Sequence, residues 1–91
     1  MRFLIEVSHE AEVASCVQAV EIFKNTGSHY LTHADFGCAD GIHSAWIIAE
    51  AENHAEARLI VPPPYRADAR VIRLKQYAMS NLDEMFPDHE G

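Results

Sequence analysis

The sequence predicts one α+β domain of ferredoxin-like βαββαβ topology, in which a four-stranded antiparallel sheet carries helices on one face and a short C-terminal helix follows. Two observations predict this fold. A segment with strand periodicity and a segment with helical periodicity open the chain, and three further strand-like segments follow with one short helix before the last. Ninety-one residues are enough for one hydrophobic core but not for two. We therefore assign residues 1–91 to a single domain, with its core in 1–76 and a C-terminal helix and tail in 77–91.

The first strand and the first helix are predicted from periodicity. Residues 2–7 alternate, and one face of this strand is apolar: Phe3, Ile5 and Val7. Ser8 is a candidate N-cap for the helix that follows and ends near residues 25–27. The apolar residues that recur at helical spacing, and that we expect to face the core, are Val13, Cys16, Val17, Val20 and Phe23.

A hairpin and a second helix are predicted in the middle of the chain. Residues 29–36 and 42–51 are strand-like, and Asp40-Gly41 between them is a strong turn signal. Asn53 begins a capping box, which predicts a helix that ends at residue 60 or 61, before the three prolines Pro62–Pro64.

Two further elements complete the chain. Residues 69–74 alternate arginine with apolar residues and form the predicted fourth strand, and Ser80 caps a short terminal helix that runs to Phe86.

Composition excludes some classes of function. The formal charge is −7, from 14 acidic against 7 basic residues, and no basic stripe offsets it, so we expect no nucleic-acid partner. No apolar run approaches the roughly 20 residues of a membrane span, and we expect no membrane partner. A strand follows Met1 almost at once, so we expect no signal peptide and a cytoplasmic protein. Cys16 and Cys38 are then free thiols in a reducing compartment.

The order of elements, together with Ile-Val-Pro-Pro-Pro-Tyr-Arg-Ala-Asp-Ala at residues 60–69, resembles the dimeric α+β barrel superfamily over residues 1–76. This superfamily includes muconolactone isomerase-like proteins and small monooxygenases. The resemblance implies a homodimer with facing sheets and a small-molecule site between the sheet and the helices or inside the barrel. It also implies a cofactor-independent isomerase or monooxygenase as one alternative for the function. No catalytic signature of the superfamily maps onto the chain.

The predicted hairpin carries residues that bind metals. If its turn is centred on Cys38, His33 lies opposite His43, Tyr30 opposite Trp46 and Thr32 opposite Ser44. The candidate ligands for a divalent transition metal (zinc, nickel or copper) are His33, Asp35, Cys38 and His43. The alternatives are a polar hairpin tip without a ligand, or Cys38 as a nucleophile with a histidine as its base.

The remaining histidines and the other cysteine receive structural interpretations. We expect His9 and His54 to be exposed at helix starts, His89 to lie in a loose tail, and Cys16 to be a small core residue. Strand parity places His33, Asp35 and His43 on the same sheet face as Ala45, which is the face that we expect the helices to cover. Metal ligands on a buried face conflict with a hairpin that is open to solvent, and the sequence leaves this conflict open.

The other sheet face mixes large apolar groups with carboxylates. Glu6 or His33 is the candidate acid–base catalyst there, and Tyr30, Trp46 and Tyr65 are the candidate walls of a ligand pocket. Glu6 as a solvated carboxylate, and a non-catalytic structural or regulatory dimer with Tyr30 and Trp46 at its interface, are the alternatives. The sequence therefore predicts a homodimer that binds a small ligand or a transition metal at the hairpin and sheet face.

Overall fold

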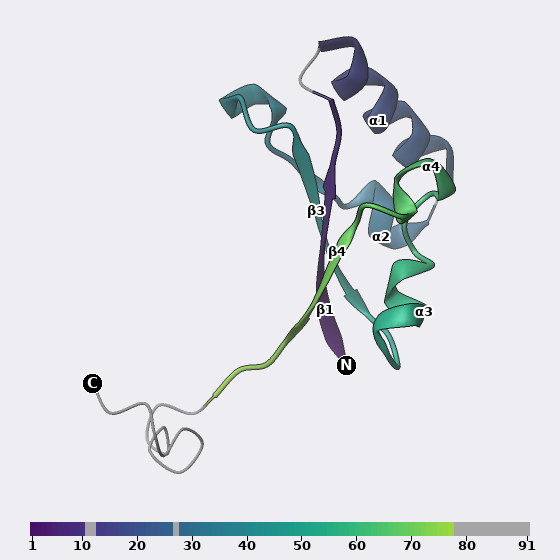
Figure 1. Ribbon diagram of the computed structural model, residues 1–91, viewed down its shortest axis with the longest axis vertical. Helices are drawn as coiled ribbons and strands as arrows, with labels where there is room; N and C mark the ends of the chain where they lie inside the picture. The colour runs from purple at the N-terminus through teal and green to yellow at the C-terminus, as the bar shows by residue number, and fades with distance from the viewer. Residues whose placement is uncertain (11–12, 27, 78–91) are drawn as a thin grey trace, which may run out of the picture.

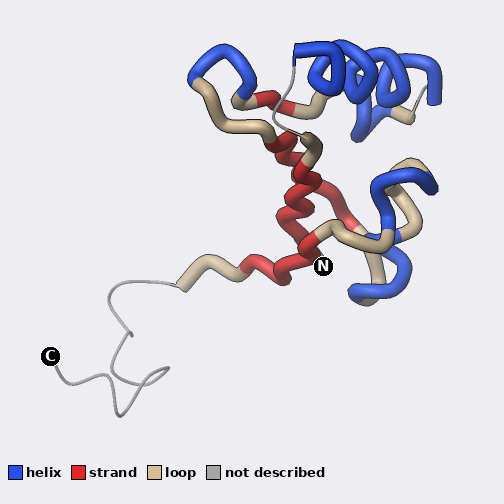
Figure 2. The backbone as a smooth tube through the Cα atoms, turned by 45° about the horizontal axis from the view of Figure 1, so that its top comes forward, coloured by secondary structure: helices blue, strands red, loops and turns tan. Residues whose placement is uncertain are grey.

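The computed structural model describes residues 1–10, 13–26 and 28–77. Its elements, in chain order, are β1 (Arg2–Ser8), α1 (Val13–Thr26), α2 (His29–Thr32), β2 (Asp35–Phe36), the 3₁₀-helix η1 (Cys38–Asp40), β3 (Ser44–Glu50), α3 (His54–Arg58), α4 (Pro63–Arg66) and β4 (Arg70–Leu74). The strands form one antiparallel sheet in the order β2-β3-β1-β4. The α-helices lie on one side of this sheet (Figures 1 and 2). The α+β class and the antiparallel four-stranded sheet are confirmed, whereas the helix expected at 80–86 and His89 lie outside the described residues.

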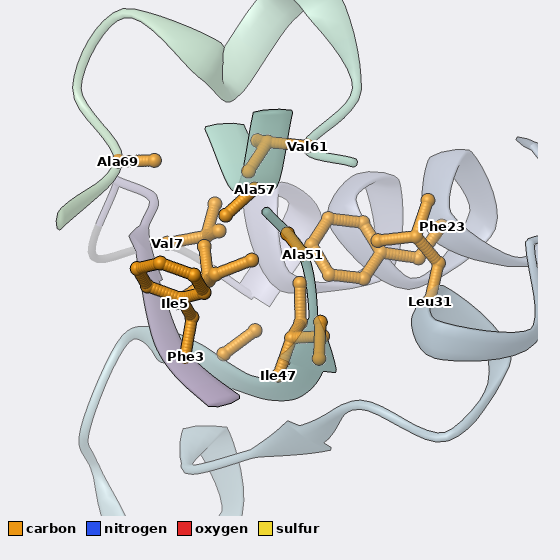
Figure 3. Close-up of a cluster of buried hydrophobic side chains, with 12 residues drawn as sticks. Phe3, Ile5, Val7, Phe23, Leu31, Ile47, Ala51, Ala57, Val61 and Ala69 are labelled. Carbon is orange, nitrogen blue, oxygen red and sulfur yellow. The ribbon is translucent and has the colours of Figure 1, made fainter. Parts of the chain in front are cut away.

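The core lies between the central strands and the helices. The predicted apolar face of β1 is fully buried, and each of its residues has a buried partner directly across on β3: Phe3↔Ala49, Ile5↔Ile47 and Val7↔Ala45. Figure 3 shows the larger of these side chains in one cluster with Phe23 of α1 and Leu31 of α2. Full burial of one such large aliphatic or aromatic side chain contributes about 1.5–3 kcal/mol. The inner face of the sheet is therefore the one that strand alternation predicts.

The buried side of α1 differs from the predicted stripe. Ala19 and Phe23 are buried, but Val17 and Val20 are 52% and 44% exposed. Phe23 packs against Phe36, with ring centroids 5.3 Å apart, and Ala19, one turn earlier on the same side of the helix, is buried as well. Ser8, predicted as the helix cap, instead ends β1 and hydrogen-bonds to Ser44 through its hydroxyl at 3.2 Å.

The predicted second strand is wrong over most of its length. His29–Thr32 form the single helical turn α2, closed by a hydrogen bond from the Thr32 amide to the Ser28 carbonyl at 3.0 Å. Only Asp35 and Phe36 pair with β3. Alternation over a few residues fits a strand and a helical turn equally well. Here the helical turn places Leu31 in the core at 2% exposure, and this packing decides the conformation.

The hairpin register is also different from the predicted one. Trp46 lies opposite Asp35 rather than Tyr30, because the connection is longer than a tight turn centred on Cys38 and includes η1. Gly41 ends η1 in the left-handed conformation, with φ 79°, and its amide donates to the Cys38 carbonyl at 3.0 Å. A Cβ at Gly37 would lie 2.9 Å from both the Trp46 ring and the Ile42 carbonyl oxygen. The two glycines therefore allow the compact path from β2 to β3.

The second half of the fold follows its sequence signals more closely. Asn53 caps α3, and its Oδ1 accepts a hydrogen bond from the Glu56 amide at 2.8 Å, as the capping box predicts. The prolines end this helix but also begin another one, since Pro63 occupies the first position of α4, where no amide hydrogen is needed.

The described residues leave the second face of the sheet without a covering layer. Ile48 of β3 is 48% exposed, and Leu4 of β1 and Ile72 of β4 are partly buried beside it. Among the described residues, no helix has the length and apolar character needed to cross a membrane.

Candidate metal centre

Four metal-ligating side chains converge at one end of the sheet. His9 follows β1, Cys16 lies in the first turn of α1, Cys38 begins η1, and His43 precedes β3. One ligand atom from each residue lies within 4.8 Å of every other one. Figure 1 shows the end of β1, the start of α1 and the teal turn η1 at this same end of the molecule. We call these four residues the His/Cys cluster.

The register of the central strands brings the two imidazoles together. Ser8↔Ser44 is the last pair of the β1–β3 ladder, and His9 and His43 are the next residues on the two strands. The His9 amide continues the ladder by donating to the His43 carbonyl at 3.0 Å. Directly opposed side chains on one face lie about 4.5–5.5 Å apart at Cβ, so the pairing alone places both rings at one site.

Two turns of helix supply the thiols. Cys16 projects from the first turn of α1, and Cys38 is held by η1 across the end of the sheet. His9 Nε2 lies 3.0 Å from the Cys16 sulfur and 3.2 Å from the Cys38 sulfur, and His43 Nδ1 lies 3.3 Å from the Cys16 sulfur. Each thiol is therefore in direct contact with an imidazole nitrogen.

These separations suit a tetrahedral metal site. With Zn–N bonds of about 2.0 Å and Zn–S bonds of about 2.3 Å, neighbouring nitrogen and sulfur ligands of a tetrahedral zinc lie about 3.5 Å apart. The three nitrogen–sulfur separations of 3.0–3.3 Å need an expansion of only a few tenths of an ångström to reach that value. All four ligand atoms lie within 4.8 Å of one another, so the set has the compactness that a shared ion requires.

Burial, and the short distances between the four side chains, shift the pKa values of His9 and Cys16 in the cluster. Desolvation, and then the neighbouring His43, lower the pKa of His9, which favours the neutral imidazole that binds metals. The pKa of Cys16 rises to about 11, first through its hydrogen bond with Cys38, then through desolvation and the charge of Cys38. The thiols are thus so close that two negative charges repel each other, and a divalent cation between them would remove this repulsion.

The two ring nitrogens of His9 have different surroundings. Its Nδ1 is buried, and it has no hydrogen-bond partner among the described residues. Buried polar side-chain atoms usually have a partner, and a metal-binding histidine usually donates a hydrogen bond from its second ring nitrogen. Nε2 is the nitrogen of His9 that faces the two sulfur atoms, and the second nitrogen has no such partner among the described residues.

The structure includes half of the predicted metal ligands in the cluster. Cys38 and His43 belong to it, but the predicted pairing of His33 with His43 is wrong, because His33 follows helix α2 instead of lying in a strand. His33 is exposed, donates from Nδ1 to the His29 carbonyl at 2.9 Å, and its ring is tilted by 40° against the His29 ring, with centroids 4.4 Å apart. Asp35 is exposed on β2, opposite Trp46. The conflict over the sheet face thus disappears, because His33 does not lie in a strand and Asp35 lies opposite Trp46 rather than opposite Ala45.

Sequence reasoning missed the other half of the cluster. His9 is partly buried rather than exposed, and Cys16 faces the cluster rather than the hydrophobic core. The register of β1 with β3 could have revealed that His9 lies opposite His43, because the alternation of the two strands predicts which of their faces lie together. His54 is exposed as expected, with its ring against Phe3 at 5.0 Å.

The candidate catalytic and pocket residues do not form one site: Glu6 and Trp46 are in contact with each other, whereas His33, Tyr30 and Tyr65 lie elsewhere. Both Glu6 oxygens are engaged: one accepts from Trp46 Nε1 at 3.0 Å, and the other lies 3.4 Å from Arg70 Nη1. Tyr30 lies on α2, and its hydroxyl accepts from the Glu50 amide at 3.4 Å, so it does not share the Trp46 face as predicted.

Tyr65, the third candidate pocket residue, lines a polar cavity of about 310 Å³ together with Asp68, Glu10 and His9. Its ring packs near Phe23, with centroids 6.1 Å apart, and burial raises the pKa of its phenol. Tyr65 thus reaches the neighbourhood of the cluster, whereas Trp46 and Tyr30 serve the sheet face and the core.

Comparison with known proteins identifies no relative of this chain. No protein-family model, no curated protein and no solved structure matches the chain. The geometry of the cluster is therefore the basis on which its function is inferred.

Proposed function

We propose that this protein binds one transition-metal ion, zinc by preference, through His9, Cys16, Cys38 and His43. The observation that carries the proposal is the convergence of four ligand atoms within 4.8 Å from four separate segments of the chain. Two thiolates and two imidazoles are a ligand set that zinc takes in tetrahedral geometry, and they also suit copper and nickel.

The ligand set favours a structural role for the ion. A catalytic zinc keeps one position open for water or substrate, whereas a structural zinc takes four protein ligands. Here all four positions can be filled by the chain. An ion would tie the ends of β1 and β3 to α1 and η1, at a place where the described residues extend the ladder beyond Ser8 by one bond, from His9 to His43. The free energy of metal binding would then stabilise this end of the fold.

Metal analysis of protein purified without a histidine tag tests the proposal. We expect close to one zinc ion per chain, and an intense visible spectrum of tetrahedral, thiolate-bound cobalt after replacement with Co²⁺. Cys16→Ser and His43→Ala should each lose the metal and the spectrum. The matched control is His29→Ala/His33→Ala, which removes the exposed histidine pair of α2 and should keep both. Wild-type protein that takes up neither ion would overturn the proposal.

An acid–base function at Glu6 has less support. Trp46 and Arg70 each contact one of its oxygens, so holding these two partners on the sheet face already accounts for Glu6.

We also infer that the topology is ferredoxin-like and that the chain forms a homodimer. The strand order β2-β3-β1-β4 with helices on one face supports the first inference. The second rests on the uncovered sheet face, where an apolar strip of Leu4, Ile48 and Ile72 lies beside the Glu6–Arg70 ion pair. A second copy related by a two-fold axis could match this strip and place opposite charges together. Membership of the dimeric α+β barrel superfamily stays a prediction.

A further inference from the structure

A groove beside the His/Cys cluster leads to its two sulfur atoms. It lies between α1 on one side and β2 and η1 on the other, and its volume is about 380 Å³. Its lining is formed by Cys16, Val17, Val20, Phe36 and Cys38, with Glu21 and Lys24 as its charged members. The two valines are the ones that periodicity predicted to be buried and that are instead 52% and 44% exposed.

The groove distinguishes the thiols from the imidazoles. Both cysteines of the cluster line it, whereas neither His9 nor His43 is among its described lining residues. A molecule that enters the groove therefore meets the sulfur atoms first. Its walls are mostly apolar, so it favours a molecule with a hydrocarbon body over a small polar one.

We infer that this groove admits an organic hydroperoxide, which oxidises Cys16 and Cys38 to a disulfide and thereby releases the metal. This inference rests on the proposed function, since it assigns a regulation to the same metal centre. A hydroperoxide fits better than an alkylating agent, because the second thiol within 4.8 Å of the first is needed only for an oxidation that ends in a disulfide.

The reaction balances with the hydroperoxide as the only oxidant. One thiolate attacks the terminal oxygen of ROOH, so that an S–O bond forms, the O–O bond breaks, and the alkoxide leaves and takes a proton from water as ROH. The other thiolate attacks the sulfenic sulfur, so that the S–S bond forms and hydroxide leaves and is protonated to water. The two sulfurs together lose two electrons, and the peroxide oxygens gain them.

Release of the metal follows from the loss of ligands. Thiolates bind zinc, whereas the sulfur atoms of a disulfide carry no negative charge and are poor ligands. After oxidation only His9 and His43 remain of the four ligands. Two neutral imidazoles bind a divalent ion far more weakly than the complete set.

The test starts from zinc-loaded, untagged protein whose metal content is measured first. Cumene hydroperoxide or hydrogen peroxide is added, zinc release is followed with a chromogenic chelator, and the Cys16–Cys38 disulfide is identified by peptide mapping without reductant. Each rate of zinc release is divided by the rate at which the same peroxide oxidises glutathione. This correction removes the difference in reactivity that the two peroxides show toward any free thiol. We expect the corrected rate to be about tenfold higher for cumene hydroperoxide, because its apolar body is buried against the groove.

A groove variant provides the matched control. Val17→Ser/Val20→Ser changes two exposed positions of α1, so the fold and the zinc content should persist while the preference for cumene hydroperoxide disappears. Zinc retained with both thiols free after peroxide treatment, or equal corrected rates for the two peroxides in the wild type, would overturn the inference and leave the proposed function intact. Failure of the proposed function would be seen earlier, as an absence of zinc before any peroxide is added.

Discussion

His9 and His43 face each other across the β1–β3 ladder one position beyond its last pair, with ring centroids 5.6 Å apart and ring planes at 89°. The same register pairs Ile5 with Ile47 in the core. A shift of one residue would turn the whole apolar face of the strand to the other side of the sheet. Packing of the core therefore also holds the two imidazoles of the His/Cys cluster in place.

Removal of the metal should destabilise the protein. Zinc at one hundred times its dissociation constant stabilises a folded chain by about 2.7 kcal/mol, provided that the unfolded chain does not bind it. For a domain of this size that corresponds to a rise in melting temperature of roughly 10–20 °C. We expect chelation to lower the wild-type melting temperature by that amount in calorimetry. In Cys38→Ser, zinc and chelator should give the same melting temperature; a zinc-dependent shift there would contradict the assigned ligand.

The face of α1 that packs on the core can be tested by a pair of substitutions. Phe23→Ala removes a side chain that is 1% exposed and should reduce the free energy of unfolding by about 3–5 kcal/mol. Val20→Ala, on the same helix at 44% exposure, should change it by less than about 0.5 kcal/mol. Urea denaturation measures both values. Similar losses for the two variants would mean that the periodic stripe, rather than the observed face, is buried.

Gly37 is required for the approach of Trp46 to the hairpin. Gly37→Ala would place a Cβ 2.9 Å from the Trp46 ring and from the Ile42 carbonyl oxygen, and should cost about 1–3 kcal/mol in the free energy of unfolding. Gly41→Asn is the control, because no atom lies within 4 Å of an added Cβ and asparagine tolerates φ 79°. Equal stability of Gly37→Ala and the wild type would contradict the described hairpin.

The contact between Glu6 and Trp46 can be followed through the only tryptophan of the chain. Loss of a hydrogen bond to a charged group costs about 1.5–3 kcal/mol, so Glu6→Ala should lower the free energy of unfolding and change the emission of Trp46. Glu50→Ala should leave both nearly unchanged, because Glu50 is an exposed carboxylate whose ion pair with the N-terminus is also exposed. An unaltered emission spectrum in Glu6→Ala would count against the contact.

Self-association through the uncovered sheet face is tested by charge. Ile48→Glu introduces a carboxylate at a 48% exposed position in the middle of this face and should convert the dimer to a monomer in analytical ultracentrifugation. Leu59→Glu, at a 64% exposed position next to α3, should leave the dimer intact. A wild-type chain that sediments as a monomer at all concentrations would rule out the homodimer.

The sequence alone determined the features that depend on neighbouring residues. The alternation of Phe3, Ile5 and Val7 predicts a strand with one buried face, and the Asn53 side chain predicts the start of α3. Both signals are local, because side-chain direction along a strand and the capping of an amide depend on residues only a few positions apart.

Tertiary structure decided the rest. The turn at His29–Thr32 is helical because Leu31 reaches the core that way, and Val17 faces outward because Ala19 and Phe23 form the buried side of α1. His9 and Cys16 join Cys38 and His43 only through the β1–β3 register and the position of α1. A metal centre depends on distances between residues far apart in the chain, and those distances follow from how strands pair and helices pack rather than from the spacing of residues in the sequence.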